Sequence, residues 1–299
     1  MERAGGTCLN WGCIPTKALL KNAHLFHTLQ HQAQEFGITF DNLSYDWSAV
    51  IGRSRNVSDR LAGGVEFLFK KNKVDYVRGY GSIVDSSHVE VKGEDGTAQV
   101  LETSNIIIAT GGKARELPGL PFNGSSVIGS REAMVLPNQP KKMVIIGAGA
   151  IGVEFAYIYN AFGTQVTLVE MMPRLVPVED DDIGDALKKS YSRQGIKCLT
   201  DTKVTATEDR GTSVAVTVEN ARGSEVLEAD VCLVAIGVVP VLPGGQLPEF
   251  TDRGWIQIGD RYETSMSGVY AIGDIAGPPW LAHTAMFEAT QCVDGIFEE

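Results

Sequence analysis

The 299-residue sequence is short of cysteine, of basic residues and of long apolar runs. Five cysteines are too few for the disulfide framework of a secreted protein of this length. Lysine and arginine total 26 against 37 aspartates and glutamates, a net charge of −11, which argues against nucleic acid or an anionic membrane as partner. The sequence has no apolar run of about 18 residues to span a bilayer and no signal-peptide pattern. We therefore expect a soluble protein of the cytoplasm.

Two of the cysteines, Cys8 and Cys13, lie where a glycine-rich stretch runs into an expected helix over residues 14–35. A helix N-terminus stabilises the negative charge of a thiolate, and Pro15 suits a first helical turn. Four intervening residues in an irregular turn can bring the two Cα atoms within the roughly 7 Å that a disulfide tolerates. Buried structural cysteines are the alternative, and a zinc site would need further ligands nearby. The flanking glycines and Lys17 favour a reversible redox pair.

A glycine fingerprint, G-x-G-x-x-G, follows an apolar strand with Gly147, Gly149 and Gly152. In such a turn the first glycine permits the bend, the second lets the backbone approach a pyrophosphate, and the third allows close packing. Glu170 ends the next strand at the spacing where an acid meets a ribose 2′-hydroxyl, which favours NAD over NADP. Only Arg174 is close enough in sequence to favour a 2′-phosphate. A glycine turn without a ligand is the alternative.

The apolar periodicity of the remaining sequence predicts an α/β protein. The expected elements are a helix over 46–71, an antiparallel meander within 74–100 that turns at Asp95-Gly96, a strand over 106–108, a crossing over 117–140, alternating strands and helices over 141–258 with hairpin strands near 214–218 and 225–227 and a buried strand at 231–237, a strand near 268–272, and a helix over 282–297.

These motifs, in this order, resemble the flavin-dependent disulfide reductases, the class I pyridine nucleotide-disulfide oxidoreductases. Within that family the cysteine segment and Glu170 are most similar to the branch that oxidises dihydrolipoamide with NAD. An NADPH-dependent disulfide or mercuric reductase, and a non-catalytic NAD-binding fragment, remain alternatives. The resemblance covers essentially the whole chain and rests on Gly5-Gly6-Thr7-Cys8, Cys13-Ile14-Pro15-Thr16-Lys17, the fingerprint ending in Glu154, Ala109-Thr110-Gly111 and Gly273-Asp274.

The resemblance implies two Rossmann-like dinucleotide-binding domains. A discontinuous FAD-binding domain with the redox disulfide would take residues 1–133 and 259–299, and an NAD-binding domain would take residues 134–258. It further implies that the FAD domain lacks its first βαβ unit and that a C-terminal dimerisation domain is absent. The sequence is therefore expected to be truncated at both ends, and the parent enzyme to be a homodimer.

The resemblance also implies roles for individual residues. Cys8 would be the interchange thiol and Cys13 the thiol that faces the flavin, with Lys17 and Glu154 paired near flavin N5. Dihydrolipoamide, carried on the lipoyl protein of a 2-oxo acid dehydrogenase complex, would reduce the pair, and electrons would pass through FAD to NAD. The expected cofactor-binding residues are Glu2, Gly6, Thr7, Lys17, Ala109, Thr110, Gly111, Gly147, Gly149, Ile151 at the nicotinamide entrance, Gly152, Glu170, Gly237, Gly273, Asp274 at the ribityl chain, Ala282, His283 and Ala285.

The remaining histidines and cysteines are expected to have no catalytic role. His24, His27 and His31 share one helical face, where a polar surface stripe is favoured over a metal site, and no metal site is expected elsewhere. His283 belongs to the flavin-side loop and is not assigned to acid–base catalysis. Three cysteines lie in apolar or helical contexts and are interpreted as structural: Cys198, Cys232 and Cys292.

Overall fold

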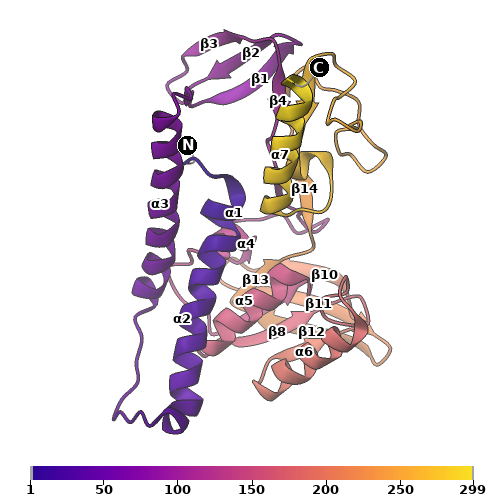
Figure 1. Cartoon of the computed structure of the whole chain (residues 1–299). Helices are drawn as coiled ribbons and strands as arrows, with labels where there is room; N and C mark the ends of the chain where they lie inside the picture. The colour runs from indigo at the N-terminus through magenta and orange to yellow at the C-terminus, as the bar shows by residue number, and fades with distance from the viewer. Residues whose placement is uncertain (1–2, 298–299) are drawn as a thin grey trace. The chain divides into compact units, whose positions relative to one another are not determined.

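The computed structural model describes residues 3–297, which form two compact units (Figure 1). Unit 1 takes residues 3–7, 63–113 and 238–297, and unit 2 takes residues 8–62 and 114–237. These units group residues by packing. The cofactor domains predicted over 1–133, 134–258 and 259–299 stay a prediction.

A five-stranded parallel sheet forms the centre of unit 2, in the order β6-β13-β7-β8-β9. The alternation of strands and helices predicted over 141–258 is confirmed. The edge strand β6 was not expected, because its two residues lie within the predicted crossing over 117–140. The strands are β6 (Val127–Ile128), β7 (Lys142–Ile146), β8 (Gln165–Val169), β9 (Lys197–Leu199) and β13 (Val231–Val234).

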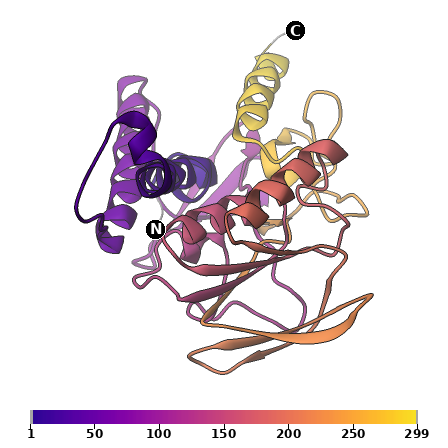
Figure 2. The ribbon, with the colours of Figure 1, turned by 90° about the horizontal axis from the view of Figure 1, so that it is seen from below.

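Two layers cover the sheet of unit 2 (Figure 2). Met143 and Ile145 of β7 face the core shared with α5 (Ala150–Ala161) and α6 (Asp181–Arg193). Val144 and Ile146 face an antiparallel sheet instead, as expected for a parallel strand buried on both sides. The predicted hairpin is confirmed, and a third strand, β10, joins it: β10 (Lys203–Asp209), β11 (Val214–Asn220) and β12 (Gly223–Ala229).

Helix α2 (Cys13–Gln32) packs along α5 through an apolar stripe of Leu19, Ala23 and Phe26. This confirms the helix predicted over 14–35, which ends in a 3₁₀ turn, η1 (Ala33–Phe36), and left-handed Gly37. A short helix, α1 (Gly6–Trp11), replaces the expected glycine-rich loop. The other helices outside the sheet layers are α3 (Trp47–Lys71), which matches its prediction, and α4 (Ser130–Ala133).

Unit 1 contains the predicted meander, in which β2 and β3 pair antiparallel around the turn at Asp95-Gly96. A second, two-stranded sheet pairs β4 with β16 in parallel, and its apolar residues share a core with Ile83, Ile256 and Ile275. Within residues 3–297, no helix is long and apolar enough to cross a membrane. The elements are β1 (Tyr80–Asp85), β2 (His88–Lys92), β3 (Ala98–Glu102), β4 (Ile106–Ile108), β5 (Gly112–Ala114), β14 (Val238–Pro240), β15 (Gly244–Gly245), β16 (Val269–Ala271), η2 (Gly273–Ala276) and α7 (Ala282–Phe297).

Candidate functional site

Cys8 and Cys13 are joined by a disulfide, and their Cα atoms lie 4.7 Å apart. Cys8 is a half-buried residue of α1, whereas Cys13 is exposed and is the first residue of α2. Pro15 lies in the first turn of α2, as predicted. Free N–H groups and the helix dipole favour negative charge at this end of α2. Of the two sulfurs, that of Cys13 is therefore the better placed to become a thiolate when the bond opens.

The pairing of Lys17 with Glu154 is present in the structure. Lys17 lies one helical turn after Cys13, so the two share a face of α2, and Glu154 extends from α5. Both side chains are partly solvated, with 61% and 26% of their surfaces exposed. An ion pair of this kind contributes no more than about 1 kcal/mol to stability. Its main consequence is to hold an ammonium group on the face that carries Cys13.

The glycine loop, residues 147–152, shows why each glycine is needed. Gly147 has a φ of 100°, and a side chain there would strike the carbonyl group of Ala235. A Cβ at Gly152 would collide with the carbonyl oxygen of Gly147. A Cβ at Gly149 would meet nothing within 4 Å, so no protein contact demands glycine there. The free space at the N-terminus of α5 fits the close approach of a pyrophosphate. Ile151, 38% exposed, follows in the first turn.

Glu170 directly follows β8 and is buried, with 8% of its surface exposed. Its Oε2 accepts a hydrogen bond from the Ala148 N–H at 2.7 Å, and its Oε1 accepts one from the Met172 N–H at 2.9 Å. The carboxylate therefore fastens the glycine loop to the end of β8. Each oxygen keeps a further lone pair, so the predicted contact with a ribose hydroxyl remains possible in this geometry and stays a prediction.

Arg174, the residue that the sequence left open as a phosphate ligand, is directed toward the start of α6. Its guanidinium group lies 3.1 Å from Asp181 and 3.5 Å from Asp185. Both contacts are exposed and are therefore weak. They nevertheless give the Arg174 side chain a position in which two carboxylates already balance its charge.

The residues predicted to contact the flavin in unit 1 follow two neighbouring strands. Ala109 and Thr110 follow β4 and are exposed, and Gly111 follows with a φ of 73°. Gly273 follows β16 with a φ of 71°, and its N–H donates to Glu288 Oε2 at 2.6 Å. Because β4 and β16 are parallel, both segments leave the same edge of the sheet. Ligands of α/β proteins bind at this carboxyl edge.

Asp274 lies in η2, half-buried, and its carboxylate makes no hydrogen bond or ion pair with another of residues 3–297. Burial, and then the charge of Glu288, raise the pKa of this carboxyl group above its ordinary value. A carboxylate that loses water without gaining a protein donor costs free energy. A ligand hydroxyl group is a partner that fits, and the ribityl chain of a flavin carries such groups.

The other predicted cofactor residues are distributed as follows. Gly6 and Thr7 lie in α1, and both are exposed. In unit 2, Gly237 has a φ of 114° and its carbonyl oxygen accepts the Arg115 N–H at 3.0 Å. Glu2 lies outside the described residues. Three more lie in the first turn of α7, where Ala282 and His283 are exposed and Ala285 is half-buried.

Two guanidinium groups in unit 2 approach the stretch between the cysteines, and the sequence contains no signal for them. Arg55 of α3 and Arg131 of α4 both lie over the ring of Trp11. Neither arginine lies at a motif spacing from the cysteines, so only the fold brings them together. Trp11 itself stands within the C-x₄-C segment and could have been singled out as an aromatic beside a redox pair.

The histidines of α2 do not form a metal site with other ligands. The His27 and His31 rings lie 4.5 Å apart, and His24 Nδ1 is 3.4 Å from the Tyr157 hydroxyl group. Burial, followed by the charges of His31 and His24, lowers the pKa of His27. Over the described part of the chain, no group of three or more His, Cys, Asp or Glu side chains could hold a metal ion.

The three free cysteines have thiols that resist ionisation. Burial raises the pKa of Cys198 to about 11 and that of Cys232 to about 12, and burial also raises the pKa of Cys292. Since the thiolate is the nucleophile, a raised pKa makes these thiols poor nucleophiles at neutral pH. Their environments agree with a structural role.

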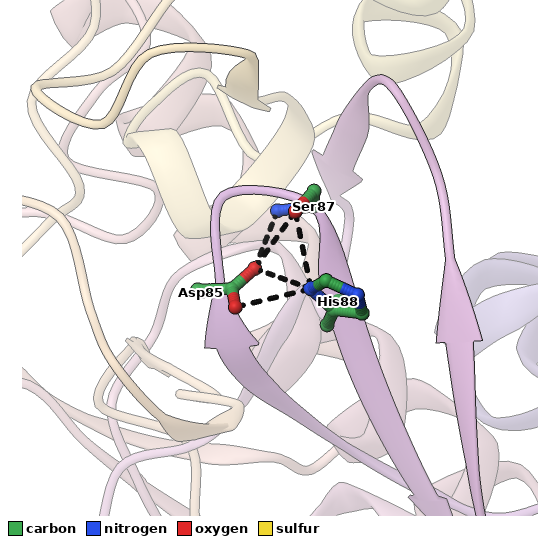
Figure 3. Close-up of polar contacts among 3 residues, drawn as sticks. All are labelled: Asp85, Ser87 and His88. Atoms are coloured by element: carbon green, nitrogen blue, oxygen red, sulfur yellow. Dashed lines mark hydrogen bonds and ion pairs between the residues drawn. The ribbon is translucent and has the colours of Figure 1, made fainter.

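A serine, a histidine and an aspartate also meet at the β1–β2 turn (Figure 3). His88 Nδ1 lies 2.9 Å from Asp85 Oδ1 and 3.1 Å from Ser87 Oγ. A catalytic triad requires the acid and the serine to engage different ring nitrogens, whereas here both engage Nδ1. The Ser87 N–H also donates to Asp85. These contacts fix the tight turn and do not activate a nucleophile.

The chain is similar to proteins of known sequence and to a protein of known structure. The chain is 42% identical over 297 residues to a dihydrolipoyl dehydrogenase of Chlorobaculum parvum and 40% identical over 296 residues to the mitochondrial dihydrolipoyl dehydrogenase of Pisum sativum. These alignments cover 98% and 97% of this chain but 63% and 59% of the relatives, so the chain spans about three fifths of their length. The crystal structure of LpdA from Mycobacterium tuberculosis matches with a TM-score of 0.90 and 23% identity, over 100% of this chain and 65% of that one, which supports the fold. With the family model described as pyridine nucleotide-disulphide oxidoreductase matching residues 1–289, this chain belongs to that family.

Proposed function

We propose that this chain carries out the electron transfer of a dihydrolipoamide dehydrogenase, from a dihydrolipoamide dithiol through the Cys8–Cys13 pair and FAD to NAD. The observation that carries the proposal is the disulfide at the N-terminus of α2, with the Lys17–Glu154 pair one turn away. Unit 2 holds this group together with the glycine loop. The similarity to relatives named dihydrolipoyl dehydrogenase supports the choice of substrate.

The exchange at the cysteine pair begins with a thiolate of the substrate. It attacks the Cys8 sulfur, the Cys8–Cys13 bond breaks, and the electron pair of that bond goes to the Cys13 sulfur. The second substrate thiol, on losing its proton, displaces Cys8 from the mixed disulfide. The substrate leaves as a disulfide, and the two cysteines have gained two electrons. The N-terminus of α2 stabilises the Cys13 thiolate that results.

Two features support sites for both cofactors: the Asp274 carboxylate has no partner among residues 3–297, and the space beside Gly149 is open. FAD, when bound, supplies a two-electron carrier between the dithiol and the nicotinamide. The residues proposed to hold FAD are Glu2, Gly6, Thr7, Lys17, Ala109, Thr110, Gly111, Gly237, Gly273, Asp274, Ala282, His283 and Ala285. Those proposed to hold NAD are Gly147, Gly149, Ile151, Gly152 and Glu170.

The partner that this chemistry fits is a lipoyl protein of a 2-oxo acid dehydrogenase complex, and we propose a homodimer as the assembly of the parent enzyme. A reducing compartment suits a pair that must open and close, which favours the cytoplasm. The relative from Pisum sativum is described as mitochondrial.

The proposal is tested by incubating the chain with FAD, removing unbound flavin and following NADH formation from NAD and dihydrolipoamide. We expect turnover that Cys8→Ser abolishes and that NADP supports poorly. A chain that retains FAD and still forms no NADH would refute the proposed activity. Preference for NADP would instead favour the NADPH-dependent disulfide reductases.

A further inference from the structure

The redox loop, residues 8–13, contains a tryptophan that two cations approach. The Cζ atoms of Arg55 and Arg131 each lie 4.5 Å from the centroid of the Trp11 ring. A guanidinium group over an indole at this distance is attracted by the negative face of the ring. Trp11 ends α1, Arg55 belongs to α3 and Arg131 to α4. All three residues belong to unit 2, so side chains from three helices meet there at one residue between the two cysteines.

Arg55 also holds the backbone of the redox loop directly. Its Nη2 donates to the Asn10 carbonyl oxygen at 2.6 Å and to Ser58 Oγ at 2.8 Å. Asn10 and Ser58 are buried, and a carbonyl at the end of a helix has no partner within that helix. The Arg55 Nε is buried without a hydrogen-bond partner. The guanidinium group is thus fixed to the loop both by the ring of Trp11 and by the carbonyl before it.

Opening the disulfide changes the covalent structure and the charge of the redox loop. The covalent tie between α1 and α2 is lost, and a thiolate appears. The contacts of Trp11 with the two arginines do not involve either sulfur atom, so breaking the bond removes none of them directly. Besides the two arginines, the elements around the loop carry Asp59 on α3, which attracts Arg55, and Glu132 on α4, which accepts the Gly129 N–H. The Lys17–Glu154 pair follows one helical turn after Cys13.

We infer that Arg55 and Arg131, which both lie on the ring of Trp11, are positioning residues. They keep the reduced redox loop in the backbone geometry of its disulfide-bonded form, and they stabilise the thiolate that reduction produces. This inference rests on the proposed role of Cys8 and Cys13 as a redox pair. It assigns a function to Trp11 beyond filling space between the cysteines. It also makes the reactivity of the thiols depend on two residues remote from them in sequence.

The test is the pH profile of thiol alkylation in the reduced chain. Dithiothreitol opens the bond: it is oxidised to its cyclic disulfide, while the two cysteine sulfurs gain two electrons and two protons. After removal of reductant, iodoacetamide labelling of the Cys8 and Cys13 peptides is followed by mass spectrometry from pH 5 to 10. The variants are R131Q, R131K and W11L, with R60Q as a control that removes an exposed charge from α3 outside the cluster.

We expect the pH midpoint of the faster thiol to rise by roughly half a unit to one unit in R131Q, because a nearby cation is lost. R131K and R60Q should stay near the parent. W11L should shift in the same direction as R131Q, since neither arginine is then held. R131Q keeps the test decisive if W11L fails to fold, because Arg131 is exposed. A profile in R131Q equal to that of the parent, or an equal shift in R60Q, would overturn the inference. A bond that dithiothreitol cannot open would refute the proposed redox role itself.

Discussion

Replacing Gly149 by alanine distinguishes an effect on nucleotide binding from an effect on the stability of the fold. Gly149 is the N-cap of α5 with φ −69° and ψ −175°, a conformation that alanine adopts without strain. Its added Cβ meets no protein atom within 4 Å. The space that the methyl group fills is the space in which we place the pyrophosphate. The variant should therefore fold normally and bind NADH poorly.

The magnitudes follow from two opposing terms. Removing a glycine from the unfolded chain stabilises by about 0.4–1 kcal/mol where the native conformation suits alanine. Alanine is a worse N-cap than glycine by a comparable amount. The net change in the free energy of unfolding should be within about 0.5 kcal/mol, a shift in Tm of no more than roughly 2 °C. Loss of close approach to the phosphates should weaken NADH binding at least about tenfold, or ~1.4 kcal/mol.

Gly152→Ala is the matched control. Its Cβ would collide with the Gly147 carbonyl oxygen, so G152A should lose about 1–3 kcal/mol or more of stability by overpacking. Thermal melting followed by circular dichroism measures the fold, and NADH fluorescence titration measures binding, both with the disulfide oxidised. If G149A binds NADH as tightly as the parent, the pyrophosphate does not lie where we place it. If G149A melts as early as G152A, the fold itself requires glycine at residue 149.

Three further changes have distinct expected outcomes. Glu170→Gln places an NH₂ group against a backbone N–H at the glycine loop, and thermal melting should show a loss of about 2–3 kcal/mol; an unchanged Tm would contradict the fastening role. Asp274→Asn should raise the Tm of the cofactor-free chain at pH 7, because the pKa of Asp274 is raised in the folded state and stability therefore falls as the pH rises through that pKa. The same variant should weaken FAD binding. Lower stability with unchanged FAD binding would count against a carboxylate that is directed at a ligand. The contacts of Asp85 with the Ser87 N–H and with His88 lower the pKa of Asp85 from 3.8 to about 2. The stabilising effect of the Asp85 carboxylate should therefore be complete above about pH 4 and lost as the pH falls toward 2. Asp85→Asn should flatten this part of the acid-stability profile, and an unchanged profile would contradict the prediction.

Much of the fold follows from local patterns in the sequence. The helices over 13–32 and 47–71 have apolar residues at helical spacing, and Asp46 Oδ1 accepts the N–H groups of Ser48 and Ala49 at the start of the second. Strand alternation and the Asp95-Gly96 turn predict the meander. Two-residue strands such as β6 and β15 have no period of their own. Their pairing with distant strands could not be predicted from local sequence.

The candidate site divides in the same way. The cysteine pair and the glycine loop are local motifs, so their chemistry is visible in the sequence. The link from Glu170 to the Ala148 N–H joins residues across two strands, and the approach of Arg55 and Arg131 to Trp11 joins three helices. Such contacts depend on tertiary packing. The Asp274 carboxylate has no hydrogen-bond or ion-pair partner within residues 3–297, which is likewise a property of the folded unit.

The most direct measurement of the central claim is a count of thiols at Cys8 and Cys13 after anaerobic addition of NADH, with and without FAD. Electron transfer between nucleotide, flavin and disulfide predicts that both cysteines become alkylatable when FAD and NADH are present together and that neither does with NADH alone. In the Cys13→Ser variant the two-thiol signal should disappear. A bridge that stays closed in a chain that has bound FAD and NADH would contradict the account.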